Sequence, residues 1–63
     1  MFYMALGRKF DWPEDRDKAE SFAIKKAGEL KRPIYVYVGS DTSAKPNMCI
    51  AVASPDGGLQ VSH

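Results

Sequence analysis

The chain has 63 residues, with nine basic and eight acidic side chains and a net charge of +1. The only cysteine, Cys49, cannot form an intrachain disulfide, and one histidine with one cysteine cannot complete a four-ligand zinc site. The near-neutral charge argues against a dedicated non-specific nucleic-acid binder, which needs excess cations to neutralise phosphates. No apolar run reaches membrane-spanning length. We therefore predict one small soluble domain, residues 1–63, in the reducing environment of the cytoplasm.

The first predicted element is a strand over residues 2–6, where the side chains alternate weakly between two faces. A connection and then a helix follow, and two helix starts are open. Pro13 suits a first helical position, whereas Asp17 and Glu20 have the spacing of a capping box. We place the start between Glu14 and Asp17, because acidic side chains there complement the positive end of the helix dipole.

The predicted helix runs to residue 30 or 31. Ala19, Ala23 and Ala27 share one of its faces. Alanines at this spacing form a smooth strip that allows the helix to lie close against a sheet. Pro33 prevents the helix from continuing.

Residues 34–38 form the central predicted strand. Isoleucine and valine alternate strictly with Tyr35 and Tyr37, and Pro33 and Gly39 bound the segment. Such alternation of β-branched and aromatic residues is typical of a strand. A polar, turn-rich loop over residues 39–47 is expected to follow it.

The last part of the chain predicts a β-hairpin. Residues 48–53 alternate between larger apolar and small side chains, as in a strand. Residues 54–57 read Ser-Pro-Asp-Gly, which suits a tight turn with proline second and glycine fourth. A short final strand over residues 59–62 completes the chain.

The element order is therefore β-α-β-β-β. The helix joins the first two strands, so these are expected to be parallel if they are neighbours, with a right-handed crossover. The last three strands should form an antiparallel meander. The predicted fold class is α+β with two layers, one helix packed on a mixed, mostly antiparallel, four-stranded sheet.

Strand alternation divides this predicted sheet into two faces. The helix is expected to cover the face with the larger aliphatic side chains: Phe2, Met4, Leu6, Ile34, Val36, Val38, Met48, Ile50, Val52, Leu59 and Val61. The opposite face is expected to carry Tyr3, Ala5, Tyr35, Tyr37, Cys49, Ala51, Ala53, Gln60 and Ser62. None of the latter residues is charged, although a solvated sheet face normally carries charged side chains.

Several interpretations of this uncharged face remain open. It packs against a second copy, it binds another protein or a ligand, or it stacks the bases of a nucleic acid. The plain alternative is that the tyrosines are simply good strand residues with their hydroxyls in water. We favour association, because a domain of about 60 residues often needs a partner to add stability.

No residue pattern predicts catalysis, a cofactor or a metal site. Cys49 lacks a nearby base and is best explained as a small buried side chain. Phe10 and Trp12, beside two basic residues, have the composition of a binding hot spot, but Trp12 is also well placed to hold the helix start against the core, which is the interpretation we favour.

The sequence therefore predicts a non-enzymatic interaction module without cofactor or metal. It would form a homodimer or dock a protein partner, like an adaptor or inhibitor, and the alternative is a small nucleic-acid-binding accessory protein. No membrane partner is expected. The predicted partner-binding residues are Tyr3, Phe10, Trp12, Tyr35, Tyr37, Cys49 and Ala51.

Overall fold

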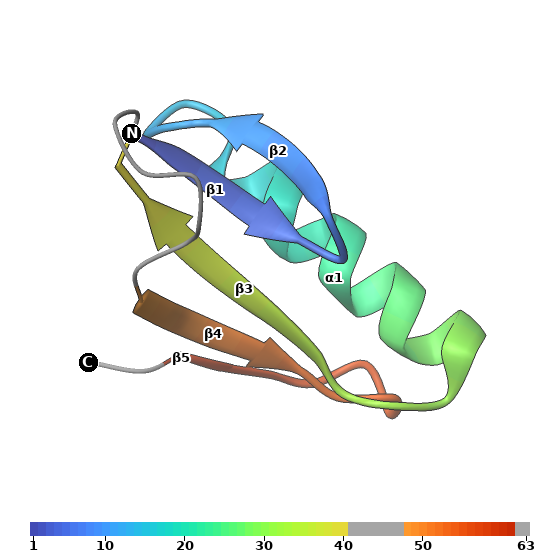
Figure 1. Ribbon diagram of the computed structural model, residues 1–63. Coiled ribbons are helices and arrows are strands. Elements are labelled where there is room, and N and C mark those ends of the chain that lie inside the picture. Colours follow the sequence, from blue (N-terminus) through green and yellow to red (C-terminus); the bar gives the residue numbers. More distant parts are fainter. Residues whose placement is uncertain (41–47, 62–63) are drawn as a thin grey trace.

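The computed structural model describes residues 1–40 and 48–61 of the chain. One helix packs on one face of a five-stranded antiparallel sheet, which is an α+β fold (Figure 1). The elements are β1 (Phe2–Ala5), β2 (Arg8–Asp11), α1 (Arg16–Leu30), β3 (Ile34–Gly39), β4 (Met48–Ala53) and β5 (Leu59–Val61). Their order across the sheet is β2-β1-β3-β4-β5.

Two predicted features fall on residues that the structure does not describe. The polar loop predicted over residues 39–47 falls for the most part on residues 41–47, which lie outside the described residues. The same holds for Ser62. Within residues 1–40 and 48–61, no helix is long and apolar enough to cross a membrane.

The prediction of four strands is wrong, because residues 8–11 form a fifth strand, β2. Leu6 and Gly7 make the two-residue turn between β1 and β2, with φ angles of 51° and 80°. Two successive left-handed residues are typical of the type I′ turn, whose twist matches that of a hairpin. β2 carries one buried residue, Phe10, so its alternation is hard to recognise as that of a strand.

The expected parallel pairing of β1 with β3 is also wrong. β1 pairs antiparallel with β3 on one side and with β2 on the other. β2 and β3 therefore run in the same direction with β1 between them, as Figure 1 shows. The helical crossover does exist, but it joins β2 to β3 because the β1–β2 hairpin reverses the chain first.

The bounds of α1 agree with the prediction. It begins at Arg16 and ends at Leu30, and its first turn contains Asp17. Asp15 is the N-cap residue, without a side-chain cap hydrogen bond, so the capping box of Asp17 and Glu20, one of the two starts considered, does not define the start. At the other end Lys31 has a φ of 55°, and the Arg32 N–H donates to the Ala27 carbonyl at 3.2 Å. This αL residue, followed by a hydrogen bond back to the carbonyl of the fourth residue from the helix end, is a Schellman-type helix end.

Small side chains dominate the core between α1 and the sheet. Ala19, Ala23 and Ala27 are fully buried, as their spacing predicted. On the sheet side, these alanines face further alanines and β-branched residues. Aromatic rings complete the core at its β1–β2 side. The buried cluster also contains Tyr3, Ala5, Phe10, Ile34, Val36, Val38, Ala51 and Ala53.

The predicted orientation of β1 is wrong. Tyr3 lies opposite Val38, and Ala5 lies opposite Val36, so both point toward the helix. Phe2 and Met4 therefore point to the opposite face. Because every residue of β1 is apolar, alternation alone cannot distinguish its two faces, and a shift of one residue exchanges them.

A β-bulge explains why the predicted faces of β4 are wrong. Val36 pairs with Ala51, but the next residue, Tyr37, pairs with Cys49, so Ile50 is left as the extra residue. The prediction placed Cys49, Ala51 and Ala53 on one face, and the bulge puts Cys49 on the face opposite to the other two. Ala51 points toward the helix, whereas Cys49 shares the opposite face with Tyr37.

The Ser-Pro-Asp-Gly turn forms as predicted. The Gly57 N–H donates to the Ser54 carbonyl at 3.0 Å, and the Ser54 N–H donates to the Gly58 carbonyl at 2.8 Å. Gly57 has a φ of 94°, a left-handed conformation that glycine adopts without a Cβ penalty. The Asp56 carboxylate accepts a further hydrogen bond from the Gly58 N–H at 2.9 Å.

Candidate interaction face

One face of the sheet has no second layer of secondary structure among the described residues, since α1 lies against the other (Figure 1). Residues paired across neighbouring strands point to the same side, so the register identifies this open face. Cross-strand pairing arranges its residues in three rows that run across the strands. The rows are Asp11, Phe2 and Gly39; then Lys9, Met4, Tyr37 and Cys49; then Tyr35, Val52 and Gln60.

Two tyrosines form the aromatic centre of the open face. The ring centroids of Tyr35 and Tyr37 lie 6.3 Å apart, with the planes tilted by 35°. This distance is within the range of favourable aromatic pairs. Tyr35 is 48% exposed, whereas Tyr37 is partly buried. A large ring left half in water on a sheet without a covering layer is a surface available for contact.

Small and aliphatic side chains surround the tyrosines on β1 and β4. Met4, Cys49 and Val52 are all partly buried. The Cys49 thiol donates a weak hydrogen bond to the Ala51 carbonyl at 3.5 Å. This part of the open face is therefore apolar and continuous across three strands.

The expectation that this face carries no charge is wrong at one edge. β2 contributes Lys9 and Asp11, which the sequence reasoning placed in a connection. The Lys9 ammonium lies 5.0 Å from the centroid of the Phe2 ring, a cation–π distance. Phe2, opposite Gly39, is buried despite pointing away from the helix. The charges therefore belong to the β2 edge, and the part formed by β3, β4 and β5 has none.

Three predicted partner-binding residues lie in the core. Tyr3 and Ala51 are buried on the helix side, for the reasons of register and bulge given above. Phe10 packs on Phe22 of α1, with ring centroids 5.6 Å apart. The placement of Tyr3 and Ala51 on the open face is therefore wrong, and Phe10 joins β2 to the helix.

Trp12 follows β2 and lies at the surface. Its ring is 6.5 Å from that of Tyr3, and it remains 42% exposed. It therefore contacts the core just before α1 begins, as the structural interpretation of this residue expected. Tyr35, Tyr37 and Cys49 are the predicted partner-binding residues that the structure brings together on the open face.

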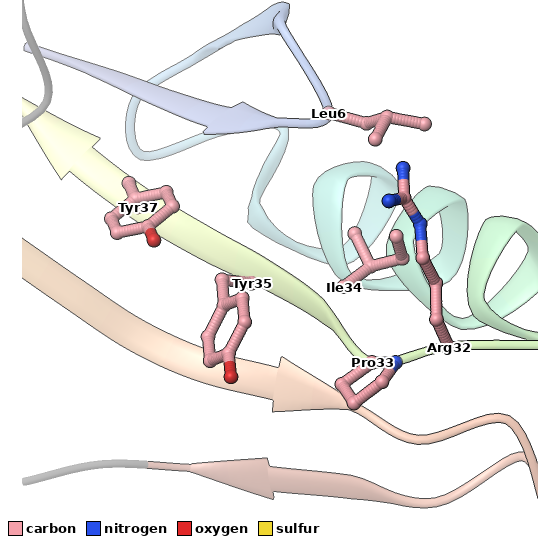
Figure 2. A pocket seen from close by; sticks show the side chains of 6 residues that line it. All are labelled: Leu6, Arg32, Pro33, Ile34, Tyr35 and Tyr37. Carbon is pink, nitrogen blue, oxygen red and sulfur yellow. The ribbon is translucent and has the colours of Figure 1, made fainter.

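A hollow opens at one end of the open face, where the β1–β2 hairpin ends before β3 does. Its volume is about 270 Å³, and it is open to solvent. Figure 2 shows Leu6 and Arg32 on one side of it and the two tyrosine rings on the other. The residues that line the hollow are Leu6, Arg32, Pro33, Ile34, Tyr35 and Tyr37.

Leu6 and Arg32 were not predicted as site residues. Leu6 occupies the first left-handed position of the hairpin turn, which costs a residue with a Cβ about 1–2 kcal/mol and favours asparagine or glycine. Its side chain is 45% exposed, so it does not compensate by filling the core. One signal in the sequence could have drawn attention to Leu6, namely a leucine in a two-residue turn, where asparagine or glycine is favoured.

Some charged side chains of α1 form ion pairs at its surface. Arg16 pairs with Glu20 at 3.3 Å, and Lys26 pairs with Glu29 at 3.1 Å. In the part of the chain that the structure describes, no three His, Cys, Asp or Glu side chains gather into a group that could hold a metal ion. Exposed pairs of this kind contribute little to stability.

Comparisons with protein-family models, with curated proteins and with solved structures find no match to this chain. The open face and the hollow are therefore interpreted from their own geometry.

Proposed function

We propose that this protein is a non-enzymatic interaction module that self-associates through the open face of its sheet. The observation that carries the proposal is the continuous apolar surface around Tyr35, Tyr37 and Val52. Tyrosine suits such a contact, because its ring buries a large area while its hydroxyl can stay hydrated at the rim. The interface would be isologous, with the same rows of residues contributed by each copy.

The composition of the core supports a second copy as the occupant. Six of the buried residues are alanines, which bury little apolar area each: Ala5, Ala19, Ala23, Ala27, Ala51 and Ala53. The only large side chain that is fully buried among the described residues is Val36. A chain of 63 residues with such a core gains little from burial within one copy. Covering the open face would add the missing apolar burial.

Light scattering after size exclusion tests the proposal directly. We expect a dimer at tens of micromolar, and we expect Val52→Lys to be monomeric because it places two ammonium groups in one desolvated contact. Ser21→Lys is the matched control, since it adds the same charge on the exposed side of α1. A wild-type protein that remains monomeric at high concentration would contradict self-association.

A different protein partner and a nucleic acid are the alternative occupants of this face. A partner protein would bind a monomeric wild type, and Val52→Lys would lose that partner while folding normally. Tyr35 stands on the same side as Lys9 and Arg32, which favours nucleic acid as the second candidate because aromatic rings and cations together bind single strands. Titration with labelled RNA and DNA over a salt series separates it, since micromolar binding with steep inverse salt dependence requires phosphate contacts.

A further inference from the structure

The hollow beside the tyrosines has the chemistry of a ligand site. A single charge lines it, the Arg32 guanidinium, and the other lining residues are apolar or aromatic. Arg32 makes no side-chain hydrogen bond or ion pair with any residue in the ranges 1–40 and 48–61. A guanidinium offers a planar fork of donors that matches a carboxylate in a bidentate contact.

We propose that this hollow binds a small monocarboxylate with an aromatic body. The carboxylate would pair with Arg32, and the ring would lie against Tyr35 and Tyr37, flanked by Leu6 and Pro33. Figure 2 shows the Arg32 side chain extending toward Leu6, and both residues line the same hollow as the tyrosine rings. The ligand thus has its charge at one end and its apolar surface at the other.

Size and charge restrict the ligand class. The volume of about 270 Å³ is slightly below the roughly 300–1,000 Å³ of pockets that hold drug-sized ligands, so one ring with a short chain fits better than a nucleotide. Phosphate groups normally require several donors, such as backbone N–H groups at a helix N-terminus. The hollow instead adjoins the C-terminal end of α1, whose partial negative charge opposes any anion, so the attraction comes from Arg32 alone. One cation among apolar walls therefore favours a monoanion of the carboxylate type.

The conformation of Leu6 supports a role in binding. Its φ of 51° is one that leucine rarely adopts, and asparagine would occupy the position with less strain. Strained backbone of this kind occurs preferentially at ligand sites. An exposed leucine at this position is explained if its side chain is needed as an apolar wall of the hollow.

The test is a titration followed by amide NMR shifts at constant ionic strength, with 3-phenylpropionate as the probe. We expect saturable shifts centred on residues 6 and 32–37. The neutral amide of the same acid and plain propionate should each bind at least about tenfold more weakly, because one lacks the charge and the other the ring. No saturable shift at tens of millimolar, or equal binding of the neutral amide, would overturn the proposal.

Two variants separate binding from folding. Arg32→Gln should weaken 3-phenylpropionate about tenfold and leave the melting temperature unchanged. Leu6→Asn should also weaken the ligand but raise the melting temperature, because it relieves the left-handed leucine. A purely structural role for Leu6 predicts no loss of binding. Unchanged binding in both variants would show that the hollow is not the site.

The inference goes beyond the proposed self-association. Because Tyr35 and Tyr37 belong both to the proposed dimer contact and to the wall of the hollow, dimer formation and binding of 3-phenylpropionate would compete, and the titration is therefore carried out on the monomeric Val52→Lys variant as well as on the wild type. Val52 does not line the hollow, so Val52→Lys should keep 3-phenylpropionate binding while it abolishes dimer formation. Loss of binding in a folded Val52→Lys monomer would overturn the ligand site. A monomeric wild type that binds the probe would contradict self-association alone.

Discussion

Lys31 holds a backbone conformation that its side chain makes costly. Its φ of 55° lies in the left-handed region, at the position after a helix where glycine is most common. The chain therefore keeps a strained residue on each side of the hollow, Leu6 in the hairpin turn and Lys31 next to Arg32. Both are places where a single substitution can add stability.

We predict that Lys31→Gly stabilises the protein. Relief of the left-handed conformation is worth about 1–2 kcal/mol, and the greater freedom of glycine in the unfolded chain offsets about 0.4–1 kcal/mol of it. The net gain in the free energy of unfolding should be about 0.8 kcal/mol, the middle of the range that these two contributions leave, measured by denaturant unfolding. Lys31→Ala is the control, because it removes the charge but keeps the strain. Equal stability of the two variants would contradict this explanation.

Gly57 is the opposite case, because glycine adopts its left-handed backbone conformation without strain. Its φ is 94°, and a Cβ added there would meet no atom within 4 Å. Gly57→Val should therefore destabilise by about 1 kcal/mol or more through backbone strain alone. Gly57→Asn should cost less, because asparagine tolerates positive φ. Thermal melts that rank valine equal to asparagine would mean that the strain is not the cause.

At the scale of the elements, α1 depends on its alanine strip for close contact with the sheet. Ala23 lies at the middle of the strip with no exposed area. We predict that Ala23→Glu destabilises the protein by about 3 kcal/mol or more, because the site has room neither for the side chain nor for its charge. Lys25→Glu, on the exposed side of α1, should stay within about 0.5 kcal/mol of the wild type. Similar melting temperatures for the two variants would contradict the packing of α1 described above.

The elements differ in how well they can be predicted from the sequence. β3 and α1 were predicted because each has one unambiguous period, strict alternation around Tyr35 and Tyr37 in the strand and alanines at spacing four in the helix. β2 was missed because its four residues include a single apolar side chain, Phe10. A charged edge strand of this kind resists pairing with other chains, and the same charges make it resemble a loop.

The candidate site was predicted in part for similar reasons. Tyr35, Tyr37 and Cys49 were assigned to one face, and the structure places them there. Tyr3 was assigned to the same face because β1 is apolar on both sides and offers no reference for its phase. The bulge at Ile50 has no distinct residue signature, so its effect on Ala51 could only be seen in the register.

For the whole molecule, the proposed dimer has a thermodynamic consequence. If folding and association are linked, the melting temperature should rise with protein concentration, because the native state is drawn toward the dimer by mass action. The double variant Tyr35→Lys with Tyr37→Lys should melt at a lower temperature that is independent of concentration. Calorimetry from about ten to several hundred micromolar measures both. A wild-type melting temperature that does not change over this range would contradict the linkage.

The position of β1 between β2 and β3 also determines how this fold can come apart. Among the described strands β2 pairs only with β1, so the β2 end of the crossover has no sheet partner until β1 is in place, whereas the β3 end also pairs with β4. The β3–β4–β5 meander, by contrast, is held by pairings between consecutive strands. Native-state hydrogen exchange should therefore give two classes of amides. Those of β1, β2 and α1 would become exposed together in one cooperative opening, while part of the meander could stay paired.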